Sequence, residues 1–312
     1  MTRELGAPTR DAFGEALAEL GAQNSRIVVV DADVTESTRT HTFMERFPER
    51  SWNTGIAESN LVGIGAGLAA SGKIPVIASF ACFLTCNAYD QIRMSIAFPN
   101  LNAKLVGSHG GISPGEDGPS QMAVEDVALM GALAGFTVIV PADASSTKAL
   151  TRAMIEHVGP TYMRTGRPKA PVIYESEPKV TLGRAIEIRA GSDVTIIANG
   201  LMVAEALDAA DELATQGLSA RVLDMHTVKP IDAEAIVSAA RDTKGIVVAE
   251  EHFAHGGLGS AVAMVVGAQA PTRMAFVNIG DTYSTSGQPD ELFEAAGITS
   301  SDIGKAALSL MS

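Results

Sequence analysis

Cysteine, aromatic side chains and clustered metal ligands are all scarce in this sequence of 312 residues. Its only cysteines are Cys82 and Cys86, and no His, Asp or Glu stands beside them at the spacing of a metal site. We therefore assign both cysteines to packing and predict no metal site within this chain. Aromatic residues make up only 5% of the chain, so two that lie close in sequence stand out.

Positive charge and long apolar runs are also limited. The 36 acidic and 23 basic residues give a net charge of -13, and the Lys and Arg residues are scattered along the chain. This pattern argues against a nucleic-acid surface. The longest apolar stretch, around residues 75–84, is far shorter than a membrane span, and the first residues lack the order of a signal peptide. We expect a cytoplasmic protein with neither a nucleic-acid nor a membrane partner.

The sequence does contain alternating strand and helix patterns. In residues 1–175, short apolar runs typical of buried parallel strands begin near residues 27, 75, 103, 137 and 161. Thr9 is positioned to cap a helix with Phe13, Leu17 and Leu20 on one face, and helical periodicity recurs over residues 120–133 and 145–158. This alternation predicts an α/β domain with a largely parallel sheet.

A second unit follows a stretch that resembles a linker. Prolines and charges without a sustained period run from residue 168 to residue 183, and we place the linker at residues 176–188. In residues 189–312, apolar runs at 194–197, 220–223, 246–249 and 274–277 alternate with helical segments, the last over 301–311. The expected fold class is therefore two α/β domains, the second one smaller.

Two glycine clusters invite comparison with nucleotide-binding loops. Gly63-Ile-Gly65-Ala-Gly67 lies inside a predicted helix that begins near Ala57, so its glycines favour close helix packing. Gly256-Gly-Leu-Gly259 stands between a predicted strand and a helix, where anion binding and a tight turn both remain open. Neither cluster matches the dinucleotide fingerprint.

Glu58 is the first candidate for chemistry. It lies among small and apolar residues in Trp52-Asn-Thr-Gly-Ile-Ala-Glu58, directly before a predicted helix. Burial would favour the neutral carboxyl group, which suits an acid that donates a hydrogen bond or moves a proton. The alternative is a carboxylate that merely stabilises the helix start.

Two further segments have the composition of ligand sites. Phe80 and Phe83 are three residues apart and suit either stacking on a flat ring or a place in the core. The segment from Ser108 to Gln121 follows a predicted strand and mixes glycines with polar residues, including His109. Loops at the carboxyl ends of parallel strands commonly carry the sites of α/β proteins, and His109 suits anion binding or proton transfer.

Together these segments resemble the transketolase family, namely its pyrimidine-binding domain followed by its C-terminal domain. The resemblance covers essentially the whole chain. Its landmarks are Thr9-Arg10, Asp31 to Thr38, Gly55 to Glu58, Phe80-x-x-Phe83, Tyr89 to Arg93, His109 to Gln121, Arg164 to Pro168, Leu223 to Pro230 and Glu250 to Gly259. Their order and spacing make the match specific, although each is short.

The resemblance implies a thiamine diphosphate enzyme. Glu58 matches the glutamate that hydrogen-bonds the pyrimidine nitrogen of the cofactor and promotes the imino tautomer, which deprotonates the thiazolium ring. Phe80 and Phe83 match the aromatic residues that flank the pyrimidine. The expected catalytic residues are Glu58 and His109, and the chain's task is to orient and polarise the cofactor.

The resemblance also implies a binding site for a sugar phosphate. The positions that match family contacts to the substrate are Arg10, Ser37, His109, Asp117, Gln121 and Arg167. The arginines, the hydroxyl and the imidazole would bind the phosphate, and Asp117 a hydroxyl beside the reacting carbon. Gln121 stands where members carry either histidine or glutamine. The stretch around Cys86-Asn87 is one residue longer than in common single-chain members.

The family motif that holds the diphosphate and its divalent metal is missing. Members use Gly-Asp-Gly and a following asparagine in an N-terminal domain, and the local Gly191-Ser-Asp193 has no such sequel. The resemblance therefore implies a partner subunit that holds the diphosphate and a magnesium or calcium ion. An assembly with two of each chain is expected, in which this subunit also associates with itself.

The first hypothesis is one subunit of a two-component transketolase that moves a two-carbon ketol unit from a ketose phosphate to an aldose phosphate. The alternatives are a subunit of another thiamine diphosphate enzyme, such as 1-deoxyxylulose-5-phosphate synthase or the β subunit of a 2-oxoacid dehydrogenase, and a non-catalytic assembly module. The loop Gly115-Glu-Asp-Gly-Pro-Ser-Gln121 and the anion-binding residues favour the transketolase.

Overall fold

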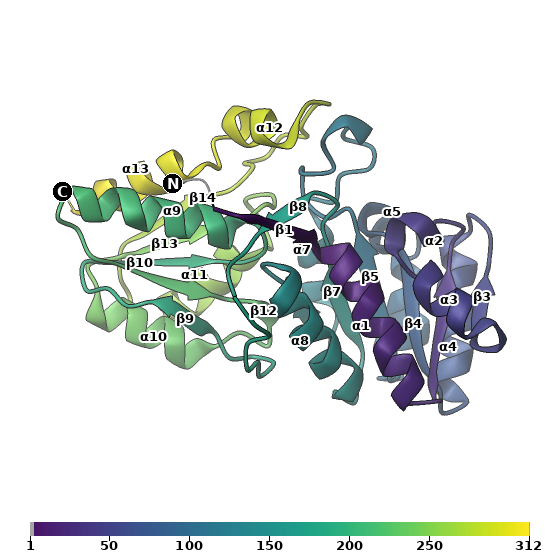
Figure 1. The fold of residues 1–312 in the computed structure, drawn as a ribbon. Helices are drawn as coiled ribbons and strands as arrows, with labels where there is room; N and C mark the ends of the chain where they lie inside the picture. Colours follow the sequence, from purple (N-terminus) through teal and green to yellow (C-terminus); the bar gives the residue numbers. More distant parts are fainter. Residues whose placement is uncertain (1–2, 312) are drawn as a thin grey trace.

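Runs of aliphatic and β-branched residues form the buried strands of two main sheets, which lie side by side in the computed structural model of residues 3–311 (Figure 1). The N-terminal unit comprises elements β1 to β8 and the C-terminal unit elements β9 to α13. This arrangement confirms the predicted fold class of two α/β units. The positions of the domain boundaries stay a prediction, and residues 186–188 of the expected linker belong to strand β9 (Ile186–Arg189).

The larger sheet has seven strands in the order β12-β6-β7-β5-β4-β2-β3. Its strands are β2 (Ile27–Asp31), β3 (Ser51–Asn53), β4 (Ile74–Phe80), β5 (Lys104–Ser108), β6 (Thr137–Ile139), β7 (Thr161–Arg164) and β12 (Thr227–Lys229). All neighbours are parallel except β12, which pairs antiparallel with β6. Because β12 comes from the C-terminal unit, that unit completes the sheet of the other. A separate pair joins β1 (Leu5–Pro8) to β8 (Lys169–Pro171).

Helices cover both faces of this sheet. They are α1 (Thr9–Gln23), α2 (Thr35–Thr38), α3 (His41–Arg46), α4 (Glu58–Ala70), α5 (Ala81–Asn87), α6 (Tyr89–Gln91), α7 (Asp126–Ala132) and α8 (Ala144–Glu156), with short helical turns at Pro48–Arg50, Ile92–Ala97 and Gly115–Asp117. Phe13 and Leu17 of α1 pack with Leu150 and Met154 of α8, which confirms the predicted apolar face of the first helix. The opposite face of the sheet shares one core with the C-terminal unit.

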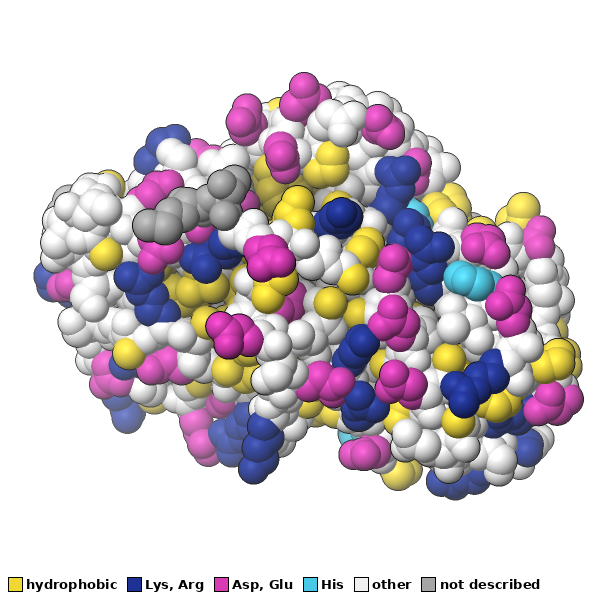
Figure 2. Space-filling model, in the orientation of Figure 1, with side chains coloured by type: hydrophobic (Ala, Val, Ile, Leu, Met, Phe, Trp, Pro, Cys, Tyr) yellow, Lys and Arg dark blue, Asp and Glu magenta, His cyan; other side chains and the backbone are white. Residues whose placement is uncertain are grey.

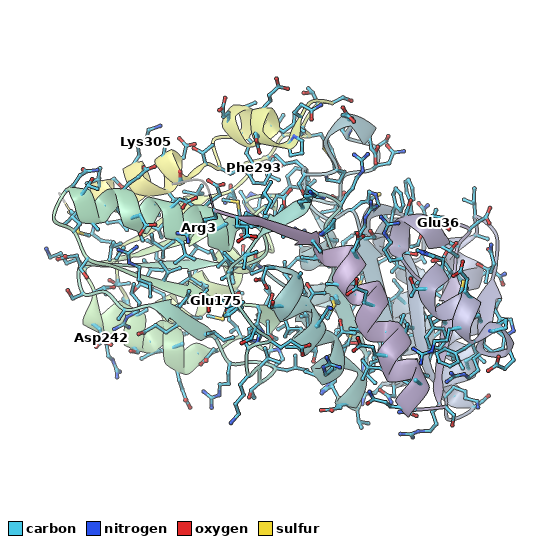
Figure 3. The ribbon with its side chains drawn as sticks, in the orientation of Figure 1. Arg3, Glu36, Glu175, Asp242, Phe293 and Lys305 are labelled. Atoms are coloured by element: carbon cyan, nitrogen blue, oxygen red, sulfur yellow. The ribbon has the colours of Figure 1, made fainter. Side chains whose placement is uncertain are left out.

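The C-terminal unit has a five-stranded sheet in the order β14-β13-β10-β11-β9. Its elements are β10 (Val194–Ala198), α9 (Met202–Thr215), β11 (Ala220–Asp224), α10 (Ala233–Asp242), β13 (Ile246–Ala249), α11 (Leu258–Gln269), β14 (Met274–Val277), α12 (Pro289–Ala296) and α13 (Ser300–Met311). Phe293 of α12 and Leu310 of α13 lie in its core, and Figure 3 labels Phe293 there. Arg3 forms ion pairs with Asp208 and Asp211 of α9, which ties the start of the chain to this unit.

Two local predictions are wrong. Thr9 does not cap α1, because Pro8 precedes the helix and the Thr9 hydroxyl oxygen instead accepts a hydrogen bond from the Gly166 amide at 2.7 Å. The helix expected over residues 120–133 is confined to α7, Asp126–Ala132. Residues 120–125 instead form loop, where the Gly111 amide donates to the Ala123 carbonyl oxygen at 2.7 Å. Tertiary contacts here override the helical periodicity.

The two glycine clusters have structural explanations. A Cβ atom on Gly65 would collide with the Ile77 side chain, so Gly65 allows α4 to approach β4. In the second cluster, the carboxylate of Glu250 accepts hydrogen bonds from the amides of Leu258 and Gly259 at 2.6 and 2.8 Å. The anion at the start of α11 is therefore supplied by the chain itself.

Within residues 3–311, no helix combines the length and the apolar character needed to cross a membrane. On the face seen in Figure 2, acidic and basic side chains are interspersed over both units, with no broad area of one sign. The scattered charge pattern of the sequence thus persists on this face of the folded chain.

Candidate active site

Strand register brings the first candidate residues together. β4 and β5 are paired so that Phe80 lies opposite Ser108, at the carboxyl end of both strands. His109 follows Ser108 with a φ of 63°, a left-handed conformation that is uncommon for residues other than glycine. This turn places the imidazole ring on Phe80, with ring centroids 3.9 Å apart and planes tilted by 11°. The loop predicted to bind a ligand thus begins at the aromatic pair.

The loop after β2 is held by a buried carboxylate. Asp31 accepts hydrogen bonds from the hydroxyl groups of Thr38 and Thr40 at 2.7 and 2.8 Å, and from the Val34 amide at 2.8 Å. Burial raises the pKa of Asp31, while these three donors lower it. The resulting turn presents the backbone carbonyl oxygen of Ser37 toward the site.

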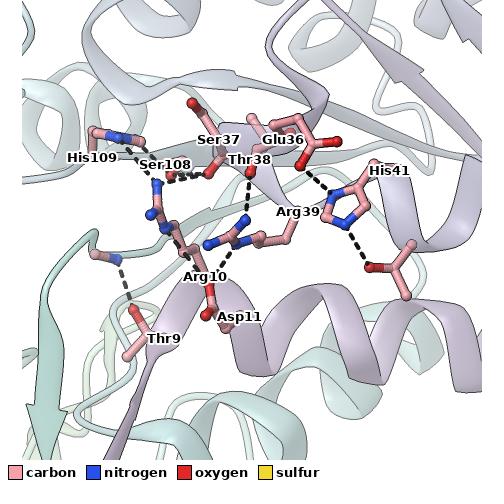
Figure 4. Close-up of polar contacts among 12 residues, drawn as sticks. Thr9, Arg10, Asp11, Glu36, Ser37, Thr38, Arg39, His41, Ser108 and His109 are labelled. Atoms are coloured by element: carbon pink, nitrogen blue, oxygen red, sulfur yellow. Dashed lines mark hydrogen bonds and ion pairs between the residues drawn. The ribbon is translucent and has the colours of Figure 1, made fainter.

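Arg10 contacts both this carbonyl group and His109, as Figure 4 shows. The Arg10 guanidinium donates to the Ser37 oxygen at 3.2 Å and lies 3.4 Å from Nε2 of His109. The other ring nitrogen, Nδ1, lies 2.8 Å from the Ser108 hydroxyl, which donates to the Ser37 oxygen at 3.5 Å. These contacts fit a neutral imidazole with its proton on Nδ1 and a lone pair on Nε2.

Electrostatics supports the neutral state of His109. Burial, followed by the charges of Arg10, Arg167 and Arg39, lowers the pKa of His109 to about 3. The imidazole therefore offers hydrogen bonds but no positive charge at neutral pH. Burial also lowers the pKa of Arg10, and the neighbouring Arg39 adds to this effect. The positive charge of the site comes from arginine alone.

Arg39 is a site residue that the sequence reasoning missed. Its Nε donates to Asp11 at 2.6 Å, and the same Asp11 oxygen lies 3.6 Å from Nε of Arg10. Arg39 has a φ of 65°, which turns its side chain back toward α1. Its place beside Ser37, directly after a family landmark, was the available signal. We call Arg10, Arg39 and Arg167 the arginine cluster.

The loop of residues 109–121, here called the donor loop, brings Asp117 to the site. Asp117 lies 4.0 Å from Nε2 of His109 and 3.8 Å from the Arg167 guanidinium. Arg167 also donates to the Pro114 carbonyl oxygen at 2.8 Å. An open pocket of about 230 Å³ is lined by Arg10, Ser113, Glu116, Arg167, Pro168, Gln288 and Pro289. Two arginines thus face a space that can hold a small anion.

The aromatic pair lies next to these groups. The rings of Phe80 and Phe83 are stacked, with centroids 5.6 Å apart and planes within 5°. Phe80 therefore contacts aromatic rings on both His109 and Phe83, and both phenylalanines are half-buried. Nearby, Cys82 is buried with its thiol 3.6 Å from the Ser120 carbonyl oxygen, and Cys86 is exposed.

Glu58 is the first residue of α4, and its side chain is buried at 6% relative exposure. The next residue, Ser59, donates to the Asn87 carbonyl oxygen at 3.1 Å, so the start of α4 lies at the end of α5, the helix that carries Phe83. Among residues 3–311, the Glu58 carboxylate has no hydrogen-bond or ion-pair partner. The residue as a whole is buried, but its carboxylate oxygens are not among the enclosed side-chain atoms that lack a partner, so the carboxylate is open to a ligand or to another chain.

The structure does not bring every candidate into one cluster. Arg10, the Ser37 backbone, His109, Asp117 and Arg167 lie together. Gln121 lies at the far end of the donor loop, where its side-chain oxygen accepts a hydrogen bond from Ser120. In the part of the chain that the structure describes, neither Gln121 nor Glu58 forms a hydrogen bond or ion pair with the arginine cluster.

Comparison with known families accounts for both units. Residues 6–172 match the pyrimidine binding domain of transketolase, and residues 183–303 match the C-terminal domain of transketolase. The chain is 41% identical over 298 residues to a 6-deoxy-6-sulfo-D-fructose transketolase subunit from Clostridium sp. (strain MSTE9), covering 96% of this chain and 92% of that one. It is 35% identical over 300 residues to one of the subunits of the apulose-4-phosphate transketolase from Phocaeicola vulgatus, with 96% of each chain covered.

A solved structure agrees along nearly the whole length. The protein described as "Split gene transketolase, inactive beta4 tetramer" superposes with a TM-score of 0.92 at 44% sequence identity, covering 98% of this chain and 99% of that one. Both domains, their order and their combined length therefore correspond. The chain belongs to the transketolase family, as a C-terminal, β-type subunit of a split transketolase.

Proposed function

We propose that this chain is the component of a two-component, thiamine diphosphate-dependent transketolase that binds the pyrimidine ring and the anionic end of the donor sugar. The reaction is transfer of a two-carbon ketol unit from a ketose phosphate to an aldose phosphate. The observation that carries the proposal is the position of His109, which stacks on Phe80 and contacts Arg10. One residue thereby joins an aromatic site to a cationic one.

The family implies thiamine diphosphate, and the residues present fit part of it. Glu58 is a buried residue whose carboxyl group has no partner in residues 3–311, and Phe83 offers an aromatic surface next to the start of α4. These residues would hold the pyrimidine, with Glu58 sharing a proton with a ring nitrogen. When bound, thiamine diphosphate supplies a carbon nucleophile and an electron sink for cleavage beside the ketose carbonyl.

The remaining residues bind and orient the donor. Arg10 and Arg167 would bind the terminal anionic group, and the charge of Arg39 strengthens their field. The Ser37 hydroxyl would donate a further hydrogen bond. On substrate binding, Nε2 of neutral His109 would exchange its 3.4 Å contact with Arg10 for a hydrogen bond from a sugar hydroxyl, and Asp117 would accept a second one. Gln121 would contact the donor hydroxyl near the reacting carbon.

The diphosphate and its divalent metal, magnesium or calcium, would be held by a partner N-terminal subunit. The missing Gly-Asp-Gly motif in this sequence supports this division. The names of the relatives, which include a sulfonated sugar and a sugar phosphate, support an anionic sugar as the substrate class. We propose an assembly of two copies of each chain, with self-association of this subunit.

The test is reconstitution with a candidate N-terminal subunit that carries Gly-Asp-Gly. Ketol transfer from D-xylulose 5-phosphate to D-ribose 5-phosphate is measured for each chain alone and for the mixture, with thiamine diphosphate and magnesium. We expect activity only in the mixture. Activity of this chain alone, or a stable complex that binds the cofactor without transferring ketol units from any ketose phosphate, would contradict the proposal.

A further inference from the structure

The C-terminal unit reaches the donor loop through the segment before α12. Figure 1 shows this segment next to the loop that follows β5. The Gln288 side chain donates to Glu116 of the donor loop at 2.7 Å, across the boundary between the two units. Gln288 is fixed at the start of α12, because its own amide donates to the Glu291 carboxylate at 3.1 Å in a capping box.

Two glycines of the donor loop allow this approach. Gly115 and Gly118 have φ values of 71° and 83°, conformations that favour glycine. A Cβ atom on Gly118 would lie 2.6 Å from the Ser286 hydroxyl, and one on Gly115 would lie 3.0 Å from the Gly287 carbonyl oxygen. The tip of the donor loop is therefore in van der Waals contact with residues 286–288.

A second contact fixes the base of the loop. The Ser113 amide donates to the Glu251 carboxylate of the C-terminal unit at 2.6 Å. Ser113 and Glu116 both line the open pocket, as do Arg10 and Arg167. The C-terminal unit thus holds the loop at two points on either side of Pro114, whose carbonyl oxygen binds Arg167.

The pocket has walls from both units. Arg10 and Arg167 line it from the N-terminal unit, and Gln288 and Pro289 line it from the C-terminal unit. We infer that Gln288 is a specificity-determining residue that limits how long a donor can be with its anionic group between the two arginines. This inference rests on the proposed function.

The charges explain why glutamine suits this position. Glu116 would repel a phosphate or sulfonate group. The side-chain amide of Gln288 donates a hydrogen bond to the Glu116 carboxylate and so holds it in place. A glutamate at position 288 would place two carboxylates in contact. A smaller residue would lengthen the pocket and leave Glu116 without its donor.

The test uses the reconstituted enzyme with ketose phosphates of five, six and seven carbons, namely D-xylulose 5-phosphate, D-fructose 6-phosphate and D-sedoheptulose 7-phosphate. For Gln288→Ala we expect the ratio of kcat/KM for the seven-carbon to the five-carbon donor to rise about fivefold, mainly through KM. Gln216→Ala, an exposed residue at the end of α9, is the matched control with an unchanged ratio.

Exchanging the charges of Gln288 and Glu116 distinguishes a role of Gln288 in lining the substrate pocket from a purely structural contact. Gln288→Glu should raise KM for all three donors, and the double variant with Glu116→Gln should restore it by re-forming the hydrogen bond. If Gln288→Ala leaves the donor ratio unchanged, or shifts it no more than Gln216→Ala does, the inference is wrong while the proposed function stands. If the unmodified complex transfers no ketol unit from any of the donors, the proposed function fails and the inference with it.

Discussion

The two units place acidic and basic groups at the carboxyl ends of their parallel strands but use them differently. In the N-terminal unit, Arg39, Glu58, His109 and Arg167 follow the strands β2, β3, β5 and β7, and Arg167 lines an open pocket together with Arg10 of α1. In the C-terminal unit, Glu250 is bound to the start of α11 and Glu251 to the Ser113 amide, while Asp224 accepts a hydrogen bond from Tyr174 at 2.8 Å. In the N-terminal unit, part of this polar set is open to the pocket while Asp31 is bound within its own loop, and in the C-terminal unit these three carboxylates join elements of the fold.

The comparison indicates why one architecture can be catalytic in one half of a chain and structural in the other. The carboxyl end of a parallel sheet can form a binding site where its polar groups lack partners within the chain. In the C-terminal unit, Glu250 binds amides of α11, Glu251 binds an amide of the N-terminal unit, and Asp224 binds a tyrosine hydroxyl, so these three carboxylates already have partners within the chain. Four substitutions test this contrast.

The largest effect is expected at Glu58. Glu58→Gln keeps the size of the side chain but removes its capacity to share a proton, so we expect kcat for ketol transfer to fall by about 100- to 10,000-fold in the reconstituted enzyme. The free energy of unfolding should change little, because Glu58 has no partner in residues 3–311. Glu45→Gln, an exposed residue of α3, is the control. Undiminished ketol transfer in Glu58→Gln would remove the assigned role.

Glu250 is the carboxylate of the C-terminal unit to compare with Glu58, because its role is structural. Glu250→Ala leaves the amides of Leu258 and Gly259 without their acceptor, and we expect the free energy of unfolding to fall by about 2–4 kcal/mol. Urea unfolding followed by circular dichroism measures this change. The KM for a phosphorylated donor should stay within about twofold in protein that remains folded. A large rise in KM without loss of stability would show that this edge also serves the substrate.

Arg167 tests the anion site. Removing one charged donor to a phosphate costs about 1.5–3 kcal/mol, so Arg167→Ala should raise KM for D-xylulose 5-phosphate by about 10- to 100-fold. An unphosphorylated ketose should be affected much less. Arg26→Ala, an exposed arginine outside the pocket, should leave both unchanged. Equal losses with both kinds of donor would mean that Arg167 supports the loop and does not bind phosphate.

The fourth prediction concerns the pH dependence of stability. Burial raises the pKa of Glu251 to about 7 from its ordinary value of 4.5, so between these two pH values the folded chain binds more protons here than the unfolded chain. The contribution of Glu251 to stability therefore falls as pH rises through this window, by up to about 1.4 kcal/mol per pH unit. Glu251→Gln should flatten the curve of unfolding free energy against pH between about 5 and 7.

The matched control for this measurement is Glu212→Gln, an exposed residue of α9. It should leave the slope of unfolding free energy against pH as in the unmodified chain. The assignment would be overturned by a Glu251→Gln curve with the original slope, since the proton uptake would then belong to another group. Asp224, whose pKa burial also raises to about 7, would be the next residue to test.

Much of the fold follows from local sequence. The apolar runs at residues 27 and 194 became fully buried strands, because short aliphatic segments cannot remain exposed and parallel sheets cover both faces of such strands. Glu58 was a candidate because a carboxyl group stood among small apolar residues. The helix expected over residues 120–133 is confined to its second half, because the carbonyl groups of Ala123 and Val124 accept hydrogen bonds from Gly111 and Phe253 instead of from a helical turn.

Only part of the candidate site could be predicted from the sequence. Arg10 and Arg167 were found through the family resemblance, whereas His109 was already a candidate from the glycine-rich polar loop that it begins. Arg39 was missed because its approach to Asp11 depends on a left-handed backbone turn. Gln288 was missed because nothing local marks it beyond a capping box, and its contact with Glu116 joins residues 172 positions apart.

Residue type and short-range period were enough to predict the two α/β units, to make Glu58 a candidate and to show that the Gly-Asp-Gly motif is absent. The burial of Glu58 was left open by the sequence and follows from the folded structure. The folded structure also sets which polar groups lack partners and which are bound within the chain. That outcome depends on strand register and on the packing of the C-terminal unit against the donor loop, where contacts between distant residues set the local environment of each side chain.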